Sequence, residues 1–208
     1  MLVAILNVKI ISHRRALLMS TKVNAAKIFG HLRTIHTHRK WVRKYCWKLG
    51  LFRQGLTHDL SKYSPTEFWE SVKYYQGTAS PIDACKKANG YSEAWMHHKG
   101  RNKHHYEYWM DNFDFGGQPI LMPYKYFAEM LCDYMGAGRA YQGKNFSYYN
   151  EWLWWRNKKA SCAMHPKMIQ MFDIIFWDLM QAEVNGWENP DDIIKDRRYV
   201  RNVYEANR

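Results

Sequence analysis

Histidine is the side chain whose number and spacing in this 208-residue chain point to chemistry. Eight of the ten histidines fall between residues 31 and 105, in close groups: His31, His36 and His38, then His58, then His97 and His98, then His104 and His105. Neutral imidazole offers a nitrogen lone pair at neutral pH and is the commonest protein ligand for metal ions. A single histidine on an apolar helix face is more often a hydrogen-bonded core residue. Groups of histidines beside acidic residues favour a metal site.

The most informative pair is His58-Asp59, which lies in the segment Thr57-His-Asp-Leu-Ser-Lys62. If this segment is helical, adjacent side chains diverge by about 100°, so both reach one ion only if it lies beside the helix. A mixed nitrogen and oxygen site suits manganese, iron, cobalt, nickel or zinc. Lys62 follows His58 by four residues, which predicts one helical turn between them and a shared face. There its ammonium group would hold a phosphate.

Helices are the elements predicted to position these residues. Ser64-Pro65-Thr66-Glu67 has a capping serine, a proline at the first helical position and a glutamate three residues after the cap. Ser80-Pro81 and Asn189-Pro190 repeat this design, and glycines predict helix ends at residues 50, 77, 90 and 143. No alternating run bounded by hairpin signals predicts a sheet. Helices are expected near residues 22–49, 65–76, 81–89, 92–99, 123–142, 148–158, 166–186 and 190–205, with a long loop at 111–118.

Apolar residues at helical spacing predict which faces are buried. In the first helix the buried face is formed by Ile28, Leu32, Ile35, Val42, Cys46 and Leu49, with His31 and His38 beside it. Most aromatic residues of the C-terminal helices are expected in the core, including Trp152, Trp154, Trp155, Phe172, Phe176 and Trp177. The expected fold is a single all-helical domain over residues 19–208, and residues 1–18 are expected to be dispensable.

Composition limits the partners and the compartment. The formal net charge is +12, which favours an anionic partner such as a nucleotide, although a well-solvated basic surface explains the excess equally well. Nucleic acid is a less favoured partner. The four cysteines are scattered without a CxxC pair, which is typical of free thiols in a reducing cytosol. No apolar run reaches the roughly 20 residues that span a bilayer, so no membrane association is expected.

The order of these residues resembles that of the HD-domain superfamily of metal-dependent phosphohydrolases. It reads His38, then His58-Asp59 with Lys62, then further histidines, and finally Asp133 on an apolar predicted helix. The resemblance covers about residues 31–140 and implies a compact HD-domain-like helical bundle, with additional C-terminal helices at about 145–205. It implies His38, His58, Asp59 and Asp133 as primary metal ligands. The stretch from His38 to His58 is shorter than usual, so His31 competes as the first ligand.

Longer motifs resemble the domain of unknown function 5662 family, whose members are small proteins of bacteria and their phages. They are Gly55-Leu-Thr-His-Asp-Leu-Ser-Lys-Tyr-Ser-Pro-Thr-Glu-Phe68, Tyr74-Tyr-Gln-Gly77 and Ala94-Trp-Met-His-His-Lys-Gly-Arg-Asn-Lys-His-His-Tyr-Glu-Tyr-Trp109. This resemblance brings no established activity. It implies a location in the cytoplasm of a bacterium or of a phage-infected host cell.

The histidines at 97–105 decide how many ions bind. If His98 and His104 or His105 point inward, the site resembles that of the two-metal superfamily members; otherwise one ion remains. The expected function is metal-dependent hydrolysis of a nucleotide or small phosphate ester, with Asp59 and Lys62 in catalysis and His98 and His104 as further ligands. Substrate contacts are expected from Lys62, Asn102 and His105. The alternatives are a di-iron oxygenase on the same ligands and a non-catalytic binding protein with a structural metal.

Overall fold

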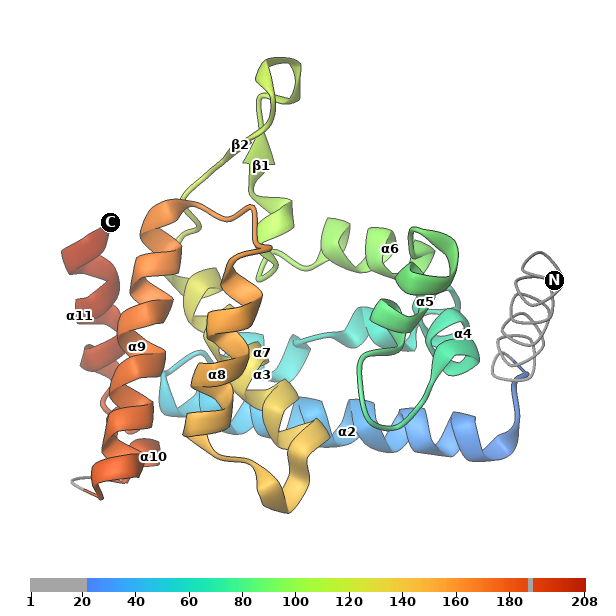
Figure 1. The fold of residues 1–208 in the computed structure, drawn as a ribbon, viewed down its shortest axis with the longest axis horizontal. Coiled ribbons are helices and arrows are strands. Elements are labelled where there is room, and N and C mark those ends of the chain that lie inside the picture. Colours follow the sequence, from blue (N-terminus) through green and yellow to red (C-terminus); the bar gives the residue numbers. More distant parts are fainter. Residues whose placement is uncertain (1–21, 187–188) are drawn as a thin grey trace, which may run out of the picture. The chain divides into compact units, whose positions relative to one another are not determined.

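The computed structural model of the chain describes residues 22–186 and 189–208 and has the all-helical fold that the sequence predicts (Figure 1). These residues form two compact units. Unit 1 contains the described residues up to Ile35 together with Ser61–His98, and unit 2 contains His36–Leu60 and Lys99–Arg208. The single domain expected for residues 19–208 stays a prediction, and residues 1–18 lie outside the described residues.

Two helices of unit 1 begin at the predicted Ser64-Pro65 and Ser80-Pro81 positions. Helix α2 (Ala25–Lys48) begins in this unit, and it is followed by η1 (Leu60–Tyr63), α4 (Pro65–Tyr74), α5 (Pro81–Asn89) and the first part of α6 (Glu93–Arg101). The Ser64 hydroxyl accepts a hydrogen bond from the Glu67 backbone N–H at 3.4 Å, with Pro65 in the first turn. Gly90 is the C-cap of α5. Its φ is 84°, a left-handed conformation that glycine adopts at little energetic cost.

Unit 2 carries the larger core and, among the described residues, the only sheet. Its elements after α2 are α3 (Phe52–Thr57), η2 (Tyr106–Tyr108), β1 (Met110–Asp111), η3 (Phe113–Phe115), β2 (Gln118–Pro119), α7 (Tyr124–Gln142), η4 (Gly143–Asn145), α8 (Tyr148–Lys159), α9 (Pro166–Asn185), α10 (Pro190–Lys195) and α11 (Arg197–Asn207). Strands β1 and β2 pair antiparallel, Met110 with Pro119, in the segment expected to be a long loop. Figure 1 shows this hairpin extending beyond the helices of unit 2.

Aromatic rings of α7, α8 and α9 form the centre of the unit 2 core. Phe127 lies 4.7 Å from Phe172 and Trp155 lies 5.1 Å from Phe172, measured between ring centroids. The prediction that Trp154 and Trp177 are core residues is wrong, because their side chains are 39% and 46% exposed. Trp154 and Trp155 are neighbours on a helix and point about 100° apart, so only one of them can face the core.

The last predicted helix, residues 190–205, is two helices. Helix α10 ends at Lys195, and the Asp196 carboxylate accepts a hydrogen bond from the Arg198 backbone N–H at 2.9 Å, which caps the start of α11. An aspartate at a capping position satisfies a backbone donor that the helix itself leaves free. Among the described residues, no helix combines the length and the apolar character needed to cross a bilayer.

Candidate metal centre

The pair His58-Asp59 lies at a break between helices rather than on one. Helix α3 ends at Thr57, His58 has non-helical backbone angles, and Asp59 has a φ of +54°. Left-handed backbone is uncommon outside glycine, and aspartate is one of the few residues that tolerate it. The prediction that His58, Asp59 and Lys62 share one helix is therefore wrong. Lys62 lies in η1, so the one-turn spacing no longer supports its role, which stays a prediction.

Arg39 on α2 holds this break in place. Its Nε donates a hydrogen bond to the His58 carbonyl at 2.9 Å, and its Nη2 donates to the Leu56 carbonyl, also at 2.9 Å. These carbonyls belong to the C-terminal end of α3, where a cation is favourable because helix carbonyls there lack backbone partners. The guanidinium group thus fixes the backbone on which the His58 ring is carried.

Four side chains from three segments meet within unit 2, and all four are buried: His38 from α2, His58 and Asp59 from the break, and Asp133 from α7. His38 Nε2 lies 3.2 Å from His58 Nε2, 3.3 Å from Asp59 Oδ2 and 3.1 Å from Asp133 Oδ1. His58 Nε2 lies 3.4 Å from both of these carboxylate oxygens. Five of the six distances among these atoms are thus 3.1–3.4 Å, and the sixth is within 4.8 Å. The centre of a regular tetrahedron with edges of about 3.3 Å lies about 2.0 Å from each corner, which is the length of a metal–ligand bond.

Close packing of α2 against α7 brings these ligands together. A methyl group placed on Gly136 of α7 would collide with the Val42 side chain and lie 3.1 Å from the Val42 backbone nitrogen. It would also lie 3.4 Å from the His38 carbonyl oxygen. Because Gly136 lacks this methyl group, the helix that carries Asp133 approaches the helix that carries His38 at the level of the four ligands.

The electrostatics of this group also favour a cation. Burial alone would lower the pKa of His58, but Asp59, Asp133 and Glu129 raise it well above its ordinary value. Burial would raise the pKa of Asp133, but hydrogen bonds from His38 and His58 hold it well below its ordinary value. Buried carboxylates are costly without a compensating positive charge. Without an ion, protons on the imidazoles provide that charge, and a dication fits the same donor set.

Glu129 is a site residue that the sequence predictions missed. Its Oε1 lies 3.1 Å from His58 Nδ1 and 3.3 Å from His104 Nδ1. Burial would raise the pKa of Glu129, but its contacts with His104 and His58 lower it, so the carboxylate is ionised and accepts both hydrogen bonds. A carboxylate behind a metal-binding histidine fixes the tautomer and the direction of the ring. The signal in the sequence is its position, four residues before Asp133 on the same helix face.

The two carboxylate oxygens of Asp59 face different donors. Oδ2 lies against His38 and His58, whereas Oδ1 lies 3.4 Å from His104 Nε2. The His104 and His105 rings are buried and lie 4.2 Å apart between centroids. Donor atoms of Asp59, His104 and His105 come within 4.8 Å of one another, close enough to hold a metal ion.

Two further predicted ligands lie in unit 1, each with partners of its own. His98 Nδ1 lies 2.6 Å from the buried carboxylate of Glu67, and Glu67 contacts His97 at the same distance through its other oxygen. The role of His98 as a metal ligand stays a prediction. His31 packs between the rings of Phe68 and Tyr75, and burial, helped by the positive charge of Lys62, lowers its pKa to about 4. His38, the other candidate first ligand, is the one that joins the four-ligand group.

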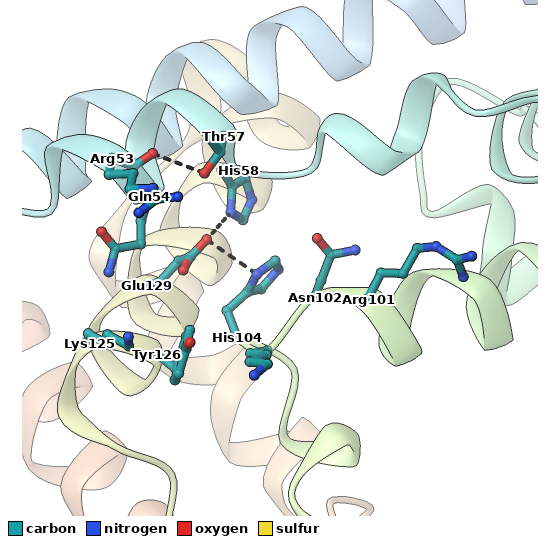
Figure 2. Close-up of a pocket in the computed structure, with 11 residues that line it drawn as sticks. Arg53, Gln54, Thr57, His58, Arg101, Asn102, His104, Lys125, Tyr126 and Glu129 are labelled. Atoms are coloured by element: carbon teal, nitrogen blue, oxygen red, sulfur yellow. Dashed lines mark hydrogen bonds and ion pairs between the residues drawn. The ribbon is translucent and has the colours of Figure 1, made fainter.

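A pocket of about 640 Å³ opens beside the centre in unit 2. Its walls are Arg53, Gln54, Thr57, His58, Arg101, Asn102, Lys103, His104, Lys125, Tyr126 and Glu129. Figure 2 shows Glu129 between the His58 and His104 rings, with residues of α3 on one side and Lys125 and Tyr126 of α7 on the other. The predicted substrate contact Asn102 is part of this wall. A pocket of this volume is of the size that binds small molecules.

Comparison with known proteins identifies the family without an activity. No curated protein and no solved structure matches the chain. The model of a family of unknown function, DUF5662, matches residues 27–176, and the chain therefore belongs to the DUF5662 family.

Proposed function

We propose that this protein is a metal-dependent phosphohydrolase that acts on a nucleotide or another small phosphate ester. The observation that supports it most is the conjunction of two features in unit 2. One is the buried donor set of His38, His58, Asp59 and Asp133. The other is a pocket of about 640 Å³ that His58 itself helps to line. The proposed relationship to HD-domain phosphohydrolases gives the reaction class by analogy.

In this proposal each residue has a defined task. A dication held by the four ligands, with a further coordination position open to water, would supply a Lewis acid for a phosphoryl oxygen and a bound water of lowered pKa. Glu129 keeps the Nδ1 protons of His58 and His104 directed toward itself, so both Nε2 atoms face the Asp59 carboxylate. Arg53 and Lys125 stabilise the negative charge of the substrate from the pocket wall. The manganese, iron, cobalt, nickel or zinc ion expected from the mixed donors is part of the proposal.

The test begins with the metal content of the purified protein. Manganese- or cobalt-loaded protein is then incubated with a panel of nucleotides and phosphodiesters, and release of phosphate or nucleoside monophosphate is measured. We expect hydrolysis of at least one compound and its loss in Asp133→Asn. Lys62→Ala is expected to slow turnover more than it weakens metal binding. A metal-loaded protein that hydrolyses nothing in the panel contradicts the proposal.

The second candidate is oxygen chemistry at two irons, and the two-sided arrangement of Asp59 favours it. Because Oδ1 and Oδ2 face separate histidines, two ions could share this carboxylate. The discriminating measurement is metal stoichiometry together with dioxygen consumption. Two irons per chain that consume dioxygen with an organic substrate support this candidate over hydrolysis. A tightly bound ion with neither activity supports a structural metal.

A further inference from the structure

The pocket beside the metal centre gathers cations that have no carboxylate partner among the described residues. Its wall carries Arg53 from α3, Arg101 at the end of α6, Lys103 just after it, and Lys125 from α7. None of the four forms an ion pair with a carboxylate in residues 22–186 and 189–208. The single carboxylate of the wall is Glu129, which contacts the imidazoles of the centre. The pocket thus has an excess of positive charge that the described chain does not neutralise.

Some cations elsewhere in unit 2 have carboxylate partners. Lys159 contacts both oxygens of Asp173 at 2.8 Å, and Lys48 lies 3.5 Å from the Asp191 carboxylate. Like charges that converge without partners repel one another, so their gathering around a cavity is unfavourable until an anion enters. The convergence of four such cations on one cavity indicates that the pocket charge serves a ligand.

Two of these cations contact aromatic rings, and one of those rings, Tyr126, is part of the wall. Lys103 Nζ lies 5.3 Å from the centroid of the Tyr108 ring, and Lys125 Nζ lies 4.7 Å from that of Tyr126. Ammonium groups are attracted to the faces of aromatic rings at this range. Lys125 is therefore held at the pocket wall before a ligand arrives, which lowers the entropy cost of binding.

We infer that this pocket binds a polyphosphate, that is, a ligand with at least two linked phosphoryl groups, such as the tail of a nucleoside diphosphate or triphosphate. The inference rests on the proposed function and names its substrate class. A monoester carries about 1.5 to 2 negative charges at neutral pH. Each linked phosphoryl group adds charge and acceptor oxygens, so a polyphosphate engages more of the four cations at once. The pocket volume of about 640 Å³ accommodates such a chain as well as a base.

Calorimetric titration of the metal-free full chain with inorganic phosphate, pyrophosphate and tripolyphosphate tests the inference without turnover. Metal-free protein is used because tripolyphosphate would otherwise bind by chelating the ion. We expect affinity to rise by about tenfold with each added phosphoryl group, since charge-assisted hydrogen bonds are strong. Arg53→Gln and Lys125→Gln should each weaken tripolyphosphate binding by about tenfold. Arg156→Gln and Lys144→Gln, at exposed positions outside the pocket, should leave it unchanged.

Each outcome separates this inference from the proposed function. Equal affinity for the three anions, or equal effects of the pocket and control substitutions, overturns the polyphosphate site even if a monoester is hydrolysed. Tighter binding of an oligothymidylate without terminal phosphates than of tripolyphosphate also overturns it, because the surface would then be one for single-stranded nucleic acid. Selective tripolyphosphate binding by the metal-free protein, together with no hydrolysis by the metal-loaded protein, supports the site and contradicts the hydrolase.

Discussion

Replacing Glu129 with glutamine tests how the metal centre is organised. The wild-type carboxylate accepts from His58 Nδ1 at 3.1 Å and from His104 Nδ1 at 3.3 Å through the same oxygen. Glutamine keeps the size of the side chain but loses the negative charge, and it presents either one carbonyl oxygen or an amide donor to two N–H groups. Loss of a carboxylate behind a metal-binding histidine lowers metal affinity by about 10- to 100-fold. This corresponds to about 1.4 to 2.7 kcal/mol.

We expect the effect of Glu129→Gln at the upper end of this range, because one carboxylate serves two rings. The assay is competition for zinc or cobalt against a chromophoric chelator at fixed pH. Glu151→Gln provides the matched control, since Glu151 is also a buried glutamate of unit 2. Burial raises its pKa to about 8, despite the opposing effects of Gln142 and Arg139, so it is mostly neutral at pH 7. An amide replaces a neutral acid there at little cost.

Two results would refute the reasoning about Glu129. A dissociation constant for Glu129→Gln within threefold of wild type would show that the shared carboxylate does not orient the ligands. An equal loss of affinity in Glu151→Gln would show that any buried substitution in unit 2 disturbs the centre. Denaturant unfolding of the metal-free proteins distinguishes a loss of metal affinity from a loss of fold.

The remaining predictions concern ligands, protons and packing. Asp133→Ala should remove stoichiometric metal binding while circular dichroism shows retained helix, whereas His165→Ala should leave metal binding unchanged. Metal affinity should rise with pH by about tenfold per unit. The raised pKa of His58 favours a protonated ring, and each ion must displace that proton. The number of protons released is measured from the binding enthalpies in buffers of different ionisation enthalpy. Gly136→Ala should destabilise the fold by about 1–3 kcal/mol in denaturant unfolding, since its methyl group would collide with α2. Gly100→Ala, whose methyl group meets nothing within 4 Å, should not destabilise it.

The helices could be predicted because their ends depend on local chemistry. Ser64-Pro65 and Asn189-Pro190 begin α4 and α10 as expected, since a capping side chain and a proline act within one turn. The break at Asp196 was missed because an aspartate in a sequence can lie either inside a helix or at the capping position of a new one. The hairpin at residues 110–119 was missed because its strands have two residues each, too few to show an alternating pattern.

The candidate site was predictable in its residue types but not in its geometry. His38, His58, Asp59 and Asp133 could be chosen by their order along the chain, and the structure brings them together. The left-handed backbone of Asp59 could not be predicted, because the turn before it depends on Arg39 of α2, which donates to the His58 and Leu56 carbonyls. Orientation of a ring by a carboxylate 71 residues away, as with His58 and Glu129, is likewise a tertiary effect.

The separation of the ligands along the chain has a consequence for how the protein matures. During synthesis His38, His58 and Asp59 emerge well before Asp133, so a nascent chain that ends before α7 lacks the fourth donor of the centre. The helix that carries Asp133 packs through Phe127 against Phe172 of α9, which is made later still. Domains generally fold as units once their sequence is available. An ion that needs all four donors would therefore bind only after α7 and α9 have been made, so its supply would act late in synthesis or after it.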